Sequence, residues 1–235
     1  NKETKMNEWG FISPYSRKCI ICGHQAPVTY EGYEGYEGQK YNIFSCLKCA
    51  VKFCEPRIPP DYNEITEESY SEYKEFSQKL KETATDRIIE VLNKNSITFA
   101  IPLEYLKDKK ETRVLDLGCS YGYFAYALRR LGYETWGTDV CTDALDFANR
   151  EFGDYYFNKH YLFEKYKTYD VIVALETIEH VIDPIKFIDE NMERLNVGGA
   201  LILTTPNRNF YLKVMAKFLF EKMGLMDHFP ISNRL

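Results

Sequence analysis

Residues 113–122 limit the possible fold more than any other stretch of this chain, because an apolar strand runs directly into a glycine turn. The residues read Arg-Val-Leu-Asp-Leu-Gly-Cys-Ser-Tyr-Gly, so Gly118 and Gly122 follow a strand that we expect to be buried. Apolar residues then recur at helical spacing, at Phe124, Ala127, Leu128 and Leu131. A strand, a glycine turn and a helix bring backbone N–H groups close to a ligand at the helix N-terminus.

Strand and helix patterns continue to alternate after this turn. Further strands are expected at 133–139, 155–158, 169–175 and 200–205. Helices are expected over 144–152 and 185–195, and Gly198-Gly199 is expected to end the second of them. The alternation predicts an α/β fold with a doubly wound, mostly parallel sheet, in which ligands bind at the carboxyl ends of the strands.

Two acidic residues fall at such strand ends. Asp116 closes the first strand, and Asp139 closes the second, 23 positions later. That spacing is close to the roughly 20-residue offset of the carboxylate that binds a ribose in nucleotide folds. A carboxylate there can accept charge-assisted hydrogen bonds from both ribose hydroxyls. Taken alone, Asp139 also fits an ordinary turn acid.

The glycine turn has rival interpretations. Residues 118–122 match Gly-x-Ser-x-Gly, the nucleophile elbow of α/β-hydrolases, which would make Ser120 a nucleophile. That fold needs several strands and a His-Gly-Gly loop upstream, and this chain has neither pattern there. A dinucleotide site needs Gly-x-Gly-x-x-Gly, and Ser120 and Tyr123 break that spacing. A purely structural turn is the remaining alternative.

The turn resembles the first motif of class I S-adenosylmethionine (SAM) methyltransferases, Asp-x-Gly-x-Gly-x-Gly, with Ser120 in place of the middle glycine. Residues 176–184 resemble the fourth-strand motif of the ubiquinone-biosynthesis-like group, and 204–207 resemble its fifth-strand ending. The resemblance covers about 112–207 and implies a Rossmann-like SAM-binding domain. The cofactor-binding residues that it implies are Asp116, Gly118, Cys119, Ser120, Gly122, Asp139, Val140, Asn158, Leu175 and Glu176.

The expected function is methyl transfer to a small-molecule acceptor, with a hydroxyl oxygen of a sugar, a phenol or quinone, or a lipid or polysaccharide precursor as the favoured target. A hydroxyl must lose its proton, and His180 after the fourth strand is the predicted general base. Glu179 is predicted to orient His180 or to bind the substrate. His180 also fits a residue that only packs at a helix start. An RNA methyltransferase and a non-catalytic zinc-ribbon module are the other candidate functions.

Four cysteines predict a metal site near the N-terminus. Cys19 and Cys22 form one CxxC pair, and Cys46 and Cys49 form another. Two such pairs give a closed, tetrahedral and therefore structural zinc site. Three Tyr-Glu-Gly repeats within 30–38 lengthen the gap between the pairs and predict a hairpin or loop. Metal-free, reduced cysteines are the alternative.

The composition limits the partners. The net charge is −5 over 235 residues, which disfavours a large nucleic-acid footprint. The sequence contains no apolar run of about 18–20 residues and no signal-peptide pattern, so we expect a cytoplasmic protein without a transmembrane segment. The sequence does not predict an oligomeric state.

We expect three parts: a zinc-binding segment at 10–57, a helical connector at 58–110 and the SAM-binding domain at 111–235. The connector aromatics at Tyr62, Tyr70, Tyr73 and Phe76 fit packing better than pocket lining. A full fold of this class closes with a strand hairpin. We expect that hairpin to be missing, since 210–226 reads as an apolar helix.

Overall fold

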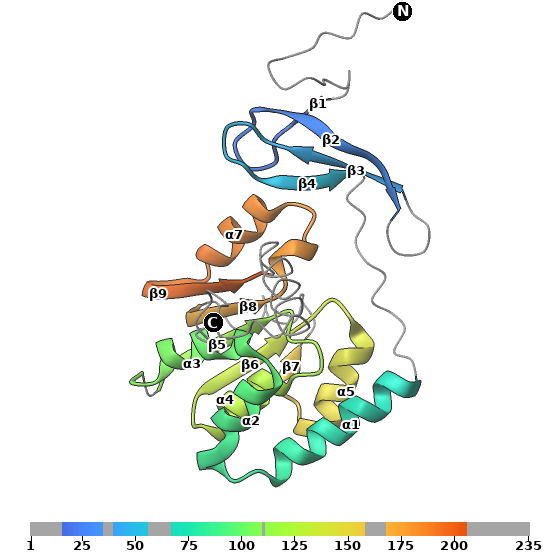
Figure 1. Ribbon diagram of the computed structural model, residues 1–235. Coiled ribbons are helices and arrows are strands. Elements are labelled where there is room, and N and C mark those ends of the chain that lie inside the picture. Colours follow the sequence, from blue (N-terminus) through green and yellow to red (C-terminus); the bar gives the residue numbers. More distant parts are fainter. Residues whose placement is uncertain (1–15, 35–39, 56–66, 110, 158–167, 206–235) are drawn as a thin grey trace, which may run out of the picture. The chain divides into compact units, whose positions relative to one another are not determined.

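A computed structural model describes residues 16–34, 40–55, 67–109, 111–157 and 168–205. The chain divides into two compact units (Figure 1), one made of residues 1–61 with 180–190 and the other of residues 62–179 with 191–235. The predicted tail helix, Asn158 and the end of the repeat segment lie outside the described residues.

A four-stranded antiparallel sheet forms the described part of the N-terminal segment. Its strands are β1 (Ser16–Lys18), β2 (Gln25–Glu34), β3 (Lys40–Ser45) and β4 (Lys52–Glu55), in that order. Its small core consists of Cys19, Ala26, Phe44, Cys46 and Phe53. β2 and β3 pair antiparallel across the repeat segment, so the predicted hairpin is confirmed for the described residues.

The second unit contains a parallel sheet whose strand order is β7-β6-β5-β8-β9. The strands are β5 (Arg113–Leu117), β6 (Glu134–Thr138), β7 (Tyr156–Phe157), β8 (Tyr169–Leu175) and β9 (Leu195–Thr204). The order reverses between β5 and β8, which is the topological switch point where such sheets bind ligands. The predicted doubly wound α/β fold is confirmed.

Helices connect and precede these strands. The α-helices are α1 (Glu67–Glu82), α2 (Ile88–Asn95), α3 (Ala100–Leu106), α4 (Tyr123–Arg130), α5 (Thr142–Phe152) and α7 (Pro184–Met192). Short 3-10 turns are η2 (Thr85–Arg87), η3 (Ile97–Phe99) and η4 (Ile178–His180). α4 ends in Arg129 and Arg130, and α5 begins with Asp143 in its first turn. Both charge placements favour the helix dipole.

The sheet is buried on both faces, as the apolar run in β8 predicts. On one face, Val114, Val171 and Val173 pack in a core with residues of the helices α1 to α4. Leu115 and Ile172, their neighbours in the chain, point to the opposite face. This alternation fixes which side of each strand end can meet the helices.

The boundary between α7 and β9 differs from the prediction. The helix ends at Met192 and the strand begins at Leu195, so Gly198-Gly199 lies within the strand and does not end the helix. Leu195 pairs with Tyr169, and the register then shifts before the regular pairing that starts at Ala200. Strand pairing thus overrides the helical spacing of the apolar residues.

Candidate cofactor site

The loop that follows β5 is closed onto β6 by backbone hydrogen bonds. The N–H groups of Gly118 and Cys119 both donate to the carbonyl of Thr138, at 2.8 and 3.0 Å. The N–H of Gly122 donates to the carbonyl of Cys119 at 2.9 Å, and α4 begins at the next residue. The glycine turn therefore has one defined conformation at the N-terminus of α4.

Every second residue of the turn adopts a left-handed backbone conformation. The φ angles are +71° at Gly118, +49° at Ser120 and +76° at Gly122. This alternation explains the glycine spacing, because glycine adopts positive φ without a steric cost. Ser120 is the exception in the motif and carries backbone strain of order 1 kcal/mol.

Neighbouring side chains leave no room for larger residues at the two glycines. A Cβ atom on Gly118 would overlap the Thr177 hydroxyl, and one on Gly122 would lie 2.6 Å from the Tyr156 ring. The Tyr156 hydroxyl also donates to the carbonyl of Gly122 at 2.8 Å. The loop is thus supported from β7 and from the residues that follow β8.

Asp139 connects the end of β6 to the glycine loop. One carboxylate oxygen accepts from the backbone N–H of Ser120 at 2.8 Å, and the other accepts from the N–H of Cys141 at 2.9 Å. A carboxylate has about four acceptor positions, so both oxygens retain capacity for ribose hydroxyls. Asp139 is half-buried, which leaves that capacity accessible.

Asp116 is a buried acid beneath the loop, only 3% exposed. Burial, together with the neighbouring Asp139 carboxylate, raises the pKa of Asp116 to about 8, while the backbone N–H of Ala125 opposes the shift. A buried carboxyl group of this kind is ready to ionise when a cation approaches. Burial also raises the pKa of the Cys119 thiol, so we expect Cys119 to remain protonated.

The end of β8 lies beside this loop, because β5 pairs with β8. Glu176 has φ +50°, and its N–H donates to the carbonyl and hydroxyl oxygens of Thr204, at 3.1 Å each. The Thr177 hydroxyl donates to the carbonyls of Leu117 and Leu175. Thr177 thus links the end of β8 to the end of β5 by hydrogen bonds.

The structure brings most of the predicted residues together and leaves a few apart. Gly118, Cys119, Ser120 and Gly122 form the hydrogen-bonded loop, to which Asp139 is bonded. Asp116 lies in β5 just before the loop, and Leu175 and Glu176 are half-buried at the end of the adjacent strand. Val140 is 71% exposed after Asp139. Glu179 and His180 are exposed in η4. Asn158 lies outside the described residues.

Sequence reasoning missed three residues that shape the loop: Tyr121, Tyr156 and Thr177. Tyr121 is a bulky aromatic within a turn of small residues, which could have been taken as a signal. The roles of Tyr156 and Thr177 depend on strand neighbours far away in the chain, and no local pattern shows them.

The serine-nucleophile interpretation does not fit this fold. β5 is the first strand of the parallel sheet among the described residues, whereas a nucleophile elbow follows strands that come earlier in the chain. The N–H of Ser120 is already bonded to Asp139, and no histidine contact is seen at its hydroxyl within the described part of the chain.

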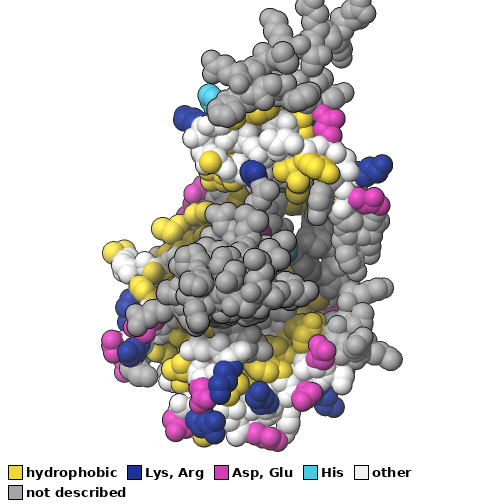
Figure 2. Space-filling model, viewed as in Figure 1, with side chains coloured by type: hydrophobic (Ala, Val, Ile, Leu, Met, Phe, Trp, Pro, Cys, Tyr) yellow, Lys and Arg dark blue, Asp and Glu magenta, His cyan; other side chains and the backbone are white. Residues whose placement is uncertain are grey.

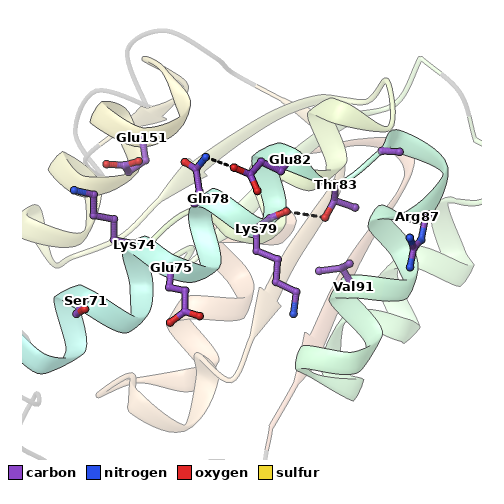
Figure 3. Close-up of a pocket in the computed structure, with 11 residues that line it drawn as sticks. Ser71, Lys74, Glu75, Gln78, Lys79, Glu82, Thr83, Arg87, Val91 and Glu151 are labelled. Atoms are coloured by element: carbon purple, nitrogen blue, oxygen red, sulfur yellow. Dashed lines mark hydrogen bonds between the residues drawn. The ribbon is translucent and has the colours of Figure 1, made fainter.

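A groove of about 1060 Å³ lies elsewhere, along α1, η2 and α2, with Glu151 of α5 at one side (Figure 3). Its lining mixes basic residues such as Lys74 with acidic ones such as Glu75. None of the residues of the glycine loop lines this groove. The groove is therefore separate from the glycine loop.

The four CxxC cysteines lie together in the N-terminal sheet. Their sulfur atoms are all within 4.8 Å of one another, and the Cys19–Cys49 and Cys22–Cys46 pairs are 3.5 Å apart. A tetrahedral zinc ion with Zn–S bonds of about 2.3 Å needs sulfurs about 3.8 Å apart. The cluster therefore has the size and the donor set of a Cys₄ zinc site.

The two cysteine turns share one geometry. The N–H of Cys19 donates to the carbonyl of His24, and the N–H of Cys46 donates to the carbonyl of Val51, five residues on in each case. The N–H of Cys49 donates to the Cys46 sulfur. This hydrogen bond is the main cause that lowers the pKa of Cys46 to about 6. Cys54 and His24 are not part of the cluster in the described chain.

Comparison with known families agrees with the fold. A family described as "Methyltransferase domain" matches residues 80–232, more than half of the chain. The chain therefore belongs to this methyltransferase family, and its sheet is that of the class I, SAM-dependent group.

Curated relatives point the same way. The chain is 30% identical over 142 residues to a ubiquinone biosynthesis O-methyltransferase of Coxiella burnetii, covering 54% of this chain and 61% of the relative. It is 32% identical over 135 residues to the protein of that name from Ruegeria sp. strain TM1040, covering 52% and 55%. The chain thus spans between about two fifths and three fifths of the length of the curated relatives it matches.

Solved structures give weaker similarities. A TehB-like SAM-dependent methyltransferase from Corynebacterium glutamicum has a TM-score of 0.40 at 16% identity, covering 63% of this chain and 83% of that one. The plantazolicin methyltransferase BpumL, in complex with SAH, has a TM-score of 0.43 at 17% identity, with 63% and 65% covered. The fold class follows from the sheet topology and the family match.

Among the described helices, none has the length and apolar character of a membrane span.

Proposed function

We propose that this chain transfers a methyl group from SAM to a hydroxyl oxygen of a small molecule. The observation that carries the proposal is the hydrogen bond between Asp139 and the N–H of Ser120, which joins the acid after β6 to the loop after β5. The O-methyltransferase names of the relatives, at about 30% identity, support oxygen as the target atom.

The proposed cofactor residues are those at the strand ends. Asp139 would accept from the ribose hydroxyls, and Asp116 would balance positive charge near the glycine loop. Cys119, Val140, Leu175 and Glu176 are proposed to line the site, with Asn158 as a further candidate. The sulfonium of bound SAM supplies an electrophilic methyl group, so the chain's main task is to hold the two reactants in place.

His180 is the proposed general base. In this proposal its imidazole takes the proton from the acceptor hydroxyl as the oxygen attacks, and Glu179 orients the imidazole or binds the substrate. Support comes from the position of both residues in η4, three and four residues after Glu176 at the end of β8.

We further propose that the cysteine cluster holds a structural zinc ion and that 10–57, 58–110 and 111–235 act as ribbon, connector and SAM-binding domain. Cys19, Cys22, Cys46 and Cys49 would supply four thiolates and leave no open position for chemistry. Among its described residues the ribbon has a core of five buried apolar side chains, so metal binding would contribute much of its folding free energy.

A small acceptor agrees with the charge distribution better than a nucleic acid does. On the face drawn in Figure 2, basic and acidic side chains are interspersed, and the described atoms there form no extended basic patch. A nucleic-acid footprint usually needs clustered Lys and Arg. RNA that binds with a steep salt dependence would argue for the RNA-modifying alternative.

An acceptor screen with zinc-loaded protein tests the proposal. SAM is supplied with sugars, phenols and polysaccharide precursors in turn, and released S-adenosylhomocysteine (SAH) is measured. We expect turnover with at least one hydroxyl compound. Turnover should be absent when that compound is replaced by its own O-methyl ether, which has no free hydroxyl. In the His180→Ala variant, kcat should fall about 10²-fold or more with the KM for SAM unchanged. Turnover only with amine or thiol acceptors would contradict oxygen as the target.

A further inference from the structure

The cofactor loop touches α1 through the ring of Tyr121. This ring stacks on Tyr73, with centroids 3.7 Å apart and an interplanar angle of 27°. Phe147 of α5 meets Tyr121 edge-on at 5.4 Å. Tyr121, the only large side chain of the turn, therefore packs between α1, which precedes the turn in the chain, and α5, which follows it.

A second contact joins the same two elements. The Tyr123 hydroxyl donates to the carbonyl of Tyr73 at 2.8 Å, and the Tyr123 ring meets Phe76 edge-on at 4.8 Å. Tyr121 and Tyr123 thus hold one turn of α1 at the point where the loop becomes α4.

The C-terminal end of α1 is fixed independently of the loop. The Arg130 guanidinium donates to the carbonyls of Lys81 and Thr83 at 3.3 and 3.0 Å, which satisfies the C-terminal end of α1. Lys81 also pairs with Glu151 at 2.7 Å. α1 is consequently anchored to α4 and α5 by contacts that do not involve the loop.

The loop needs such support because two of its residues do not favour the loop conformation by themselves. Gly122 has no side chain, and Ser120 is held at a φ of +49° that it adopts at a cost. A loop that is ordered before the ligand arrives loses less entropy when the ligand binds.

We propose that Tyr73 is a positioning residue for SAM binding, acting through its stack on Tyr121 to hold the glycine loop ready for the cofactor. This inference rests on the proposed cofactor site. It makes α1 and cofactor binding thermodynamically linked, so that each stabilises the other.

The test compares four forms of the full, zinc-loaded chain by calorimetry with SAH. Tyr73→Leu keeps apolar volume but removes the ring, Tyr73→Phe keeps the ring, and Phe99→Leu is the control. Phe99 also stacks on a helix residue, Phe124, at 5.1 Å, but makes no contact with the loop residue Tyr121. Circular dichroism confirms folding at the temperature used.

We expect Tyr73→Leu to weaken SAH binding about tenfold, the size of a lost aromatic pair. Tyr73→Phe and Phe99→Leu should stay within about twofold of the original chain. Hydrogen exchange gives a second readout: SAH should slow exchange over residues 73–82 in the original chain, and much less in Tyr73→Leu.

The outcomes separate this inference from the proposed function. If the original chain binds SAH and Tyr73→Leu binds equally well, or exchange in α1 does not respond to SAH, the positioning role is wrong and the cofactor site stands. If Phe99→Leu loses as much affinity as Tyr73→Leu, the effect is general destabilisation and the inference also fails. If the original chain does not bind SAH at all, the proposed function itself fails.

Discussion

Asp139 accepts a hydrogen bond from the backbone N–H of Ser120 at 2.8 Å, so the acid at the end of one strand fixes the loop at the end of its neighbour. The same carboxylate is the proposed ribose ligand. One side chain would then both shape the loop and bind the sugar.

Replacing Asp139 should therefore affect stability and cofactor binding together. In Asp139→Asn one acceptor oxygen becomes an NH₂ donor, so at least one of the two backbone bonds weakens, at a cost of about 1–2 kcal/mol in the free energy of unfolding. SAH affinity should fall at least tenfold, measured by calorimetry. Asp143→Asn, a change of the same type in the first turn of α5, is the control and should leave SAH affinity unchanged. Equal binding by Asp139→Asn would argue against the ribose role.

Gly122 should tolerate alanine poorly for a reason that Gly132 does not share. Both residues have positive φ, at +76° and +94°, so alanine costs about 1 kcal/mol of backbone strain at either position. Only at Gly122 would the new Cβ also meet Tyr156 and Ala148, at 2.6 and 2.9 Å. Overpacking there should add about 1–3 kcal/mol in chemical denaturation. Equal losses for the two variants would show that the loop has room that this packing does not predict.

The pKa of Asp116, raised to about 8, predicts a pH-dependent stability. Unfolded Asp titrates near pH ~3.9, so between about pH 4 and pH 8 the folded protein holds a proton that the unfolded chain has released. The free energy of unfolding should fall as the pH rises through this window, and Asp116→Asn should flatten the dependence. Denaturation at several pH values measures both, and parallel curves for the two proteins would contradict the assignment.

The same group links pH to cofactor binding. A cationic ligand favours the carboxylate, so binding should release a proton and affinity for SAM should rise from about pH 6 to pH 8. Calorimetry in buffers of different ionisation enthalpy detects that proton. In Asp116→Asn the release should disappear, which separates Asp116 from other titrating groups.

The cysteine cluster predicts one zinc ion per chain. Cys46→Ser should lose the metal and unfold the N-terminal sheet, since two of the five core residues that the structure describes there are cluster cysteines. Cys54→Ser is the matched control, because Cys54 lies on β4 outside the cluster. Metal analysis after dialysis gives the stoichiometry. Zinc retained by Cys46→Ser, or lost from Cys54→Ser, would contradict the ligand set.

Much of the parallel sheet could be predicted from the sequence because its strands are apolar runs separated by amphipathic helices. β8 matches its predicted bounds of 169–175. The start of β9 could not be predicted, since Leu195 continues the helical spacing. Its strand conformation depends on pairing with Tyr169, which lies 26 positions earlier. α3 lies within the predicted helical connector, but its bounds could not be predicted, because its seven residues include Pro102 and show no clear period.

The residues of the candidate site could be predicted from the sequence, but the contacts between them could not. Glycine spacing and strand-end acids point to the loop. The bond from Ser120 to Asp139 depends on the register that pairs Leu117 with Thr138, which no local pattern contains. The stack of Tyr73 on Tyr121 depends likewise on how α1 packs.

Direct binding of SAM and SAH to the purified, zinc-loaded chain is the measurement closest to the central claim. We expect one site per chain by calorimetry, with binding abolished or greatly weakened in a chain carrying both Asp139→Ala and Gly118→Val. A well-folded chain that gives no heat and no thermal stabilisation with either compound at millimolar concentration would contradict the account.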